Sequence, residues 1–185
     1  MVAWYDNLYK LILTGVSGVG KSNAMSRFAR NEFSSESTST IGVEFEIKNL
    51  EIDNHIVEVS IWDFAAEEKF RASFLLSYST PFPSVDITSR FSFENARCYW
   101  LHEIRKSADP NAVIMLVGNK VDLGESSREV KTEEGRSLAE EEGLLFIETS
   151  ALDATNIDAA FTILISKICS NFSTKTQGCP ESTDN

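Results

Sequence analysis

Apolar runs alternate along this chain with segments of helical periodicity. Residues 9–14 have the composition of a buried strand, and residues 113–117 are almost wholly apolar, as burial on both faces of a sheet requires. Apolar side chains recur at helical spacing over 93–104 and 157–168. This alternation of strands and crossover helices predicts an α/β fold with a mostly parallel sheet.

An antiparallel hairpin is predicted at one edge of that sheet. Residues 43–47 and 56–62 alternate apolar and polar side chains, and Asp53-Asn54 between them supplies turn chemistry. The remaining expected elements are a helix with Ala24, Met25 and Phe28 on its inner face, an acidic helix over 132–142 and a short strand over 144–147.

One segment departs from the alternation. The sheet needs an apolar central strand before residue 90, but Pro81 and Pro83 lie there one residue apart. Proline has no N–H for the ladder, so two such residues are hard to accommodate in a central strand. We therefore expect a damaged central strand near 82–88, in which at most 85–88 pair.

The composition argues against several classes of protein. The chain has 185 residues, which favours one domain, and 17 Lys and Arg against 28 Asp and Glu give a net charge of −11. That surplus of carboxylates argues against a nucleic-acid-binding protein with a broad basic face. Three cysteines are too few for a disulfide framework or a four-ligand zinc site. With no membrane-spanning run and no secretory pattern in the sequence, we expect a cytoplasmic protein.

Residues 15–22 carry the strongest chemical signal. Their sequence matches the phosphate-binding pattern G-x-x-x-x-G-K-[ST] between a predicted strand and a predicted helix. The glycines let backbone N–H groups point at phosphate oxygens, with Lys21 at the β- and γ-phosphates and the Ser22 hydroxyl on Mg²⁺. A chance glycine-rich turn is the alternative, and the strand–loop–helix context argues against it. The residues expected to touch the nucleotide here are Gly15, Ser17, Gly18, Val19, Gly20, Lys21, Ser22 and Asn23.

Asn119-Lys120-Val121-Asp122 follows the buried strand 113–117. The Asp122 carboxylate can accept hydrogen bonds from N1–H and the 2-amino group of guanine, whereas adenine has an acceptor at N1 and no 2-amino group. Asn119 would brace the neighbouring loops, and the Lys120 stem would lie over the base. Alone, this motif is a weak signal, because Asn and Asp after a strand usually make an ordinary turn.

A third motif, Glu148 to Leu152, ends the next strand. There the Ala151 backbone N–H can reach the guanine carbonyl oxygen, with Ser150 and Leu152 beside it, although a helix-capping turn is the alternative. All three motifs stand at strand ends along the carboxyl edge of one sheet, where such folds bind ligands. Together they predict a guanine-nucleotide site.

With these motifs the chain resembles the Ras superfamily of small GTPases and, within it, the Rab family. Residues 27–33 and 39–45 are most similar to the plant Rab-A clade. The resemblance implies the P-loop fold of small GTPases, with a six-stranded sheet and helices on both faces. It implies a GTPase domain over residues 1–172, followed by a disordered tail over 173–185.

The resemblance also assigns roles that the residues alone do not. It implies GTP or GDP and Mg²⁺ as cofactors, with Ser22, Thr40 and Asp63 holding the metal and Phe33 packing on the guanine ring. Without it, Phe33 reads as a core residue and Thr40 as an ordinary loop residue.

The family pattern breaks after Trp62-Asp63. Rab proteins continue T-A-G-Q-E, whereas this chain has Ala66 in place of the glycine that binds the γ-phosphate and Glu67 in place of the glutamine that orients the attacking water. Alanine restricts φ, and an ionised carboxylate cannot donate a hydrogen bond and repels the phosphate. By this resemblance Lys21 and Glu67 occupy the catalytic positions. Because Ala66 and Glu67 depart from the family pattern, we expect slow GTP hydrolysis.

The resemblance implies that effectors and regulators bind through the regions 40–45 and 62–71 of a monomer. The resemblance implies three aromatic residues for effector binding. Phe45 and Trp62 are two of them, and Ser77 stands at the position of the third. Cys179 is a single, non-terminal cysteine where Rab proteins usually carry a terminal pair for lipids, which argues against membrane attachment. If lipidated, the protein would sit on the cytoplasmic face of trans-Golgi, endosomal or plasma membranes.

Three hypotheses remain. The first is a Rab-type switch in vesicle traffic that binds GTP and GDP with Mg²⁺ and hydrolyses slowly. The second is a pseudo-GTPase that binds nucleotide or partners without cycling. The third is a degenerate paralogue or an imperfect gene prediction, in which the 64–85 segment and the tail are defects.

Overall fold

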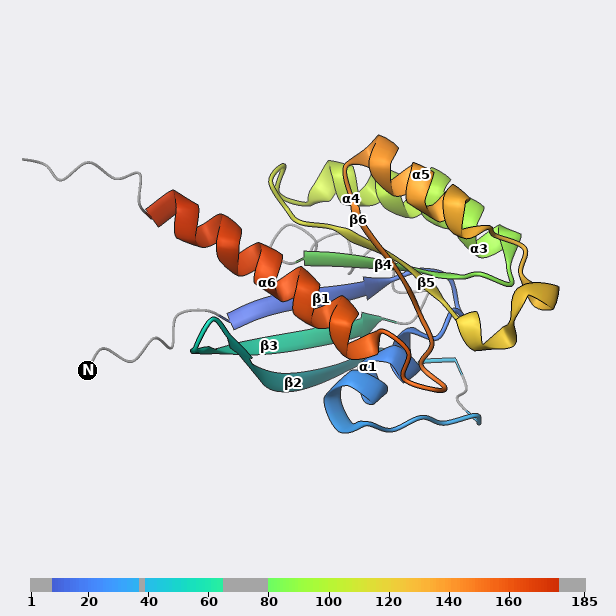
Figure 1. Cartoon of the computed structure of the whole chain (residues 1–185), viewed down its shortest axis with the longest axis horizontal. Coiled ribbons are helices and arrows are strands. Elements are labelled where there is room, and N and C mark those ends of the chain that lie inside the picture. The colour runs from blue at the N-terminus through green and yellow to red at the C-terminus, as the bar shows by residue number, and fades with distance from the viewer. Residues whose placement is uncertain (1–7, 37–38, 65–79, 177–185) are drawn as a thin grey trace, which may run out of the picture.

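The computed structural model describes residues 8–36, 39–64 and 80–176. They form a six-stranded sheet with the order β2-β3-β1-β4-β5-β6 (Figure 1). Its strands are β1 (Leu8–Thr14), β2 (Val43–Ile52), β3 (His55–Phe64), β4 (Thr80–Asp86), β5 (Met115–Asn119) and β6 (Leu145–Thr149). Only β2 and β3 pair antiparallel, so the predicted mostly parallel α/β sheet is confirmed.

Helices cover both faces of the sheet. The helices α1 (Lys21–Arg30) and α6 (Ile157–Thr176) pack on one face, and in Figure 1 α6 crosses β1 and β3. There Phe161 stacks between Phe28 and Phe82, with ring centroids 4.1 and 4.8 Å away. The opposite face is covered by α3 (Arg90–Asn95), the π-helical turn η1 (Ala96–Trp100), α4 (Leu101–Ser107) and α5 (Thr132–Glu142).

The helical stripes predicted from the sequence are buried as expected. On α6 the buried side chains are Ile157, Ala160, Phe161, Leu164, Ile165 and Ile168. This helix continues to Thr176, past the start of the predicted tail at residue 173, while Cys179 lies outside the described residues. No helix in the described ranges has the length and apolar composition needed to cross a bilayer.

The predicted edge hairpin is confirmed. Its two turn residues, Asp53 and Asn54, have φ angles of 50° and 63°. Both lie in the left-handed region, which Asp and Asn tolerate and which matches the twist of a two-residue hairpin. The strand β2 therefore forms the outer edge of the sheet, paired with β3 along its whole length.

The prediction of a damaged central strand is wrong. The strand β4 lies between β1 and β5, and residues 80–83 pair with β1 while 84–86 pair with β5. Successive N–H groups of a strand point to opposite neighbours, so Pro81 and Pro83 lack donors on one side only. The β5 ladder begins at Ser84, beyond both prolines, and so the missing donors do not interrupt it.

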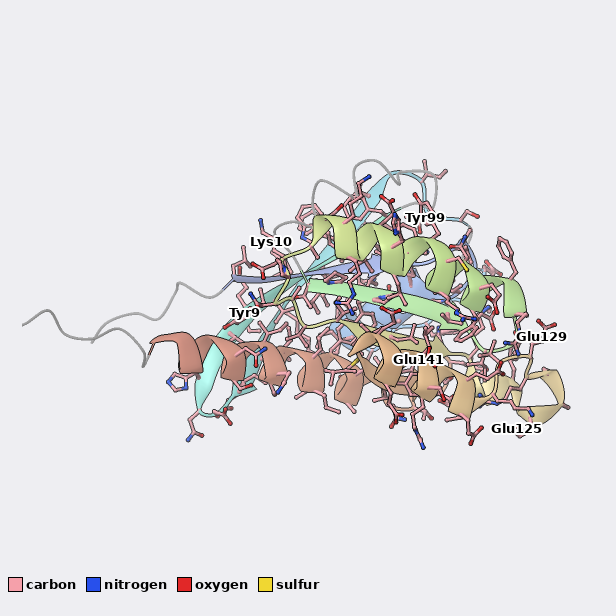
Figure 2. All side chains as sticks on the ribbon, turned by 90° about the horizontal axis from the view of Figure 1, so that it is seen from above. Tyr9, Lys10, Tyr99, Glu125, Glu129 and Glu141 are labelled. Atoms are coloured by element: carbon pink, nitrogen blue, oxygen red, sulfur yellow. The ribbon has the colours of Figure 1, made fainter. Side chains whose placement is uncertain are left out.

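Exposed carboxylates lie on α5 and in the segment before it. Figure 2 shows Glu125 and Glu129 at one end of the molecule, in the segment before α5, and Glu141 near the other end of that helix. All three side chains are exposed. Part of the chain's net negative charge therefore faces solvent on this helix and just before it.

Candidate nucleotide-binding site

The segment between β1 and α1 is a glycine-rich loop at the carboxyl edge of the sheet. Gly15 and Gly20 have φ angles of +137° and +93°, which other residues rarely adopt. A Cβ at Gly15 would stand 2.4 Å from the Ser84 carbonyl oxygen, and one at Gly20 would stand 2.4 Å from Asn119 Nδ2. Both glycines are therefore required by the backbone conformation and by close neighbours.

Lys21 is folded back over this loop. Its side chain is buried, and Nζ donates to the carbonyl oxygens of Gly15 and Val16, both 3.1 Å away. Burial lowers the pKa of Lys21, while the charge of Asp63 acts in the opposite direction. A buried ammonium group at the centre of a glycine-rich loop is suited to an anionic ligand.

Three side-chain oxygens meet beside Lys21. Ser22 Oγ lies 2.5 Å from Asp63 Oδ2 and 2.8 Å from Thr40 Oγ1, and Thr40 Oγ1 lies 3.3 Å from the same Asp63 oxygen. Asp63 is completely buried, and its Oδ1 has no hydrogen-bond partner among the described residues. Burial raises its pKa, and the Lys21 charge opposes this shift. Hydroxyl and carboxylate oxygens of this kind, with one carboxylate oxygen unpaired, fit Mg²⁺.

Asn119 ends β5 and joins three segments. Its Nδ2 donates to the Val19 carbonyl oxygen at 2.9 Å. Its Oδ1 accepts from Thr149 Oγ1 at 3.2 Å and from the Ala151 N–H at 3.3 Å. The side chain is buried, so it fixes the glycine-rich loop relative to the segment after β6, as the sequence predicted.

Asp122 lies in the short helical turn η2 (Val121–Leu123) and accepts a hydrogen bond from Ser150 Oγ at 2.5 Å. Lys120 before it has a left-handed backbone with φ 72°, and its Nζ lies 2.6 Å from Asp86 Oδ2. Its Cε is 4.0 Å from the position of a Cβ on Gly20. The Lys120 stem therefore passes beside the glycine-rich loop toward the end of β4.

The chain that carries this site has relatives among known proteins. A sequence model of the Ras family matches residues 10–170. The chain belongs to the Ras family. It is 50% identical to Ras-related protein RABA2b of Arabidopsis thaliana over 98% of this chain and 85% of the relative. It is 51% identical to both RABA1e of Arabidopsis thaliana and Rab11D of Lotus japonicus, over 89% of this chain and 76% of each relative. The predicted resemblance to plant Rab-A proteins is thus confirmed.

Other predicted site residues of this Ras-family chain lie at the rim of the site. Asn23 and Ser34 exchange two hydrogen bonds of 3.0 and 3.1 Å, and Ser17 Oγ lies 3.1 Å from Ser39 Oγ. Phe33 is 36% exposed, which excludes its alternative reading as a core residue. The rim also includes Gly18 and Leu152, both exposed, whereas Ala66, Glu67 and Ser77 lie outside the described residues.

The outer face of the hairpin carries exposed aromatic and aliphatic side chains. Phe45 and Trp62 stack with ring centroids 5.2 Å apart, and Phe45 remains 56% exposed. Ile47 and Ile56 on the same hairpin are 54% and 72% exposed. Two of the aromatics expected for effector binding are therefore adjacent and accessible.

Sequence reasoning missed two residues that support the site. Asp86 ends β4 at the same carboxyl edge and pairs with Lys120, so the rule used for the other strand ends could have found it. Arg27 donates from α1 to the carbonyl oxygens of Ala151 and Leu152. No local pattern reports that contact, because a charged residue on an amphipathic helix is typical of a solvated face.

Proposed function

We propose that this Rab-type small GTPase is a guanine-nucleotide switch that acts in vesicle traffic and hydrolyses GTP slowly. The observation that carries the proposal is the position of Asn119, which joins the glycine-rich loop at Val19 to Ala151. Asp122 and Ser150 pair beside it, so the residues proposed to hold the phosphates and those proposed to read the purine would form one continuous site. Residues 1–172 would make up this nucleotide-binding domain.

The proposed roles divide along that site. Backbone N–H groups of the glycine-rich loop and the Lys21 ammonium group would bind the phosphates, since the helix N-terminus and the buried cation both favour anions. Asp122 would accept from guanine N1–H and the 2-amino group, and the Ala151 N–H would donate to the guanine carbonyl. The remaining contacts would come from Gly15, Ser17, Gly18, Val19, Gly20, Asn23, Phe33, Ala66, Asn119, Lys120, Ser150 and Leu152.

Ser22, Thr40 and Asp63 would hold Mg²⁺. Bound there, the ion would neutralise negative charge on the β- and γ-phosphates. The chain's own contribution is to bring three oxygens from separate segments within 3.3 Å of one another.

The slow hydrolysis follows from Ala66 and Glu67. A glycine-to-alanine change restricts the backbone where the switch must rearrange. A glutamate at the water-orienting position has no proton to donate when ionised, and its charge repels the γ-phosphate. Both changes raise the barrier to hydrolysis without touching Asp122 or the glycine-rich loop, so binding is expected to survive.

A fluorescent GDP analogue tests the binding. The wild-type chain should bind it in the presence of Mg²⁺, and Asp122→Asn should lose GDP but gain xanthosine diphosphate, because an amide complements the carbonyl at xanthine C2. Asp53→Asn in the hairpin turn is the matched control and should change neither affinity. A folded wild-type protein that binds neither GDP nor GTP would overturn the proposal.

Single-turnover GTP hydrolysis tests the rate. The double variant Ala66→Gly, Glu67→Gln should hydrolyse faster than the wild type, by at least about tenfold if the residue that orients the water recovers its role. Equal rates would show that these two residues do not limit hydrolysis.

A second candidate, the pseudo-GTPase, is favoured by the same two residues. It predicts that GTP binds and that phosphate release stays at the level of the buffer blank. In both cases the exposed Phe45–Trp62 stack would bind protein partners within the regions 40–45 and 62–71 of a monomer. Phe45→Ala should then weaken partner binding while leaving GDP affinity unchanged.

A further inference from the structure

Arg27 connects two segments at the base-reading end of the site. Its Nε donates to the Ala151 carbonyl oxygen and one Nη to the Leu152 carbonyl oxygen, both at 2.9 Å. The other Nη donates to the backbone and side-chain oxygens of Asn31, both at 3.0 Å. One guanidinium group therefore spans from α1 to a segment 124 residues later in the chain.

We infer that Arg27 is a positioning residue for guanine recognition, an inference that rests on the proposed function. The guanidinium is a rigid planar fork, so its bonds to two successive carbonyl oxygens fix the orientation of their peptide planes. The peptide before Ala151 is held from the other side, because its N–H points at Asn119 Oδ1. Arg27 holds the carbonyl side of residue 151 in place, so the Ala151 N–H, which donates to Asn119 Oδ1, would be presented to the guanine carbonyl as a shared donor.

The same side chain fixes a second wall of the site. Asn31 ends α1 with a left-handed backbone, φ 58°, and its N–H returns to the Arg27 carbonyl oxygen. The chain then turns toward Phe33, which would pack on the purine ring. Arg27 thus ties the end of α1 to the Ala151 segment, and under the proposed function these two segments would flank the base.

Two substitutions distinguish a positioning role of Arg27 from an effect of its charge and from an effect on the stability of α1. Arg27→Lys keeps the charge but replaces the planar fork with a single ammonium group, which cannot reproduce the in-plane bonds to both carbonyls. Arg30→Ala removes an arginine one turn later, where the side chain is exposed and pairs with Glu32 and Glu46. It is the matched control for losing an arginine from α1.

The experiment measures dissociation constants for three nucleotides. GDP carries all the groups that the site would read, IDP lacks the 2-amino group that Asp122 would bind, and 6-thio-GDP has sulfur, a weak acceptor, in place of the carbonyl oxygen. Arg27→Ala should weaken GDP and IDP equally, by about tenfold, the worth of one hydrogen bond. It should weaken 6-thio-GDP by no more than about twofold, because that ligand never made the full contact.

Arg27→Lys should behave like Arg27→Ala, and Arg30→Ala should bind all three nucleotides like the wild type. If Arg27→Ala fails to give a cooperative melt, Arg27→Lys carries the test alone. An equal loss for all three nucleotides, or no loss, would overturn the positioning role while leaving the proposed function intact. A wild-type protein that does not bind GDP would instead remove the proposed function and this inference with it.

Discussion

The side-chain amide of Asn119 donates to the carbonyl oxygen of Val19, 100 residues earlier in the chain, at 2.9 Å. The amide oxygen accepts from Thr149 and Ala151 on the opposite side. Because the group is buried, each of these partners would lose a hydrogen bond without gaining water if the side chain were removed. This one side chain thus connects the glycine-rich loop to the segment that would read the base.

Asn119→Ala should therefore weaken nucleotide binding. Leaving the Val19 carbonyl and the Thr149 hydroxyl unpaired costs on the order of 1–3 kcal/mol per group, so GDP affinity should fall at least about tenfold. The dissociation rate of a fluorescent GDP analogue measures this. Asn49→Ala, on an exposed position of β2, is the control and should leave the rate unchanged. A wild-type rate in Asn119→Ala would contradict the bridging role.

Gly20→Ala should disturb the same connection from the other side. Its Cβ would stand 2.4 Å from Asn119 Nδ2, so the amide must move away from Val19, and φ +93° adds backbone strain. We expect GDP affinity to fall by more than about tenfold. Gly143→Ala tests backbone strain without a steric clash, because φ there is +65° and no atom lies within 4 Å of the added Cβ. It should lower stability by about 1 kcal/mol and keep GDP affinity.

Two aromatic stacks should respond differently to truncation. Phe161 is completely buried against Phe28 and Phe82, so Phe161→Ala should lower the free energy of unfolding by about 3–5 kcal/mol. Phe45 stacks on Trp62 but is 56% exposed, so Phe45→Ala should cost less than about 1 kcal/mol. Urea unfolding of both variants checks this, and equal costs would mean that the Phe45 stack is structural.

Glu134 makes stability depend on pH in the acid range. Hydrogen bonds from Arg90, and then from the Lys131 N–H, lower its pKa from 4.5 to about 2. A lowered folded-state pKa adds stability above the unfolded value and loses it as pH falls through the folded value. The urea midpoint difference between wild type and Glu134→Gln should thus be constant above pH 5 and shrink from about 4.5 to about 2. In an Arg90→Ala background this shrinkage should largely disappear, and a difference that is undiminished at pH 2 would argue against the ion pair.

Local patterns were sufficient for most of the fold and for finding the motifs that lie together at the candidate site. The glycine-rich loop, the hairpin turn at Asp53 and the stripe of α6 each depend on residues close in sequence. The prolines of β4 were misjudged because the sequence does not tell which neighbour a given N–H faces. The roles of Ala66 and Glu67 remain predictions.

Long-range side-chain contacts explain what the sequence could not supply. Arg27 reaches Ala151 across 124 residues, and Lys120 pairs with Asp86 from a different strand end. Both contacts depend on the spatial order of the strands in the sheet rather than on the spacing of residues along the chain. The Arg27 contact is visible only in the folded structure, whereas Asp86 could have been found from its place at a strand end.

The two ends of β4 pair with different neighbours: residues 80–83 pair with β1 and residues 84–86 pair with β5. Between Pro83 and Ser84 the ladder passes from β1, which leads into the glycine-rich loop, to β5, which leads into Asn119. A shift in the register of this strand would therefore displace the glycine-rich loop relative to Asn119. The nucleotide affinity proposed for this protein should therefore depend on the register of β4.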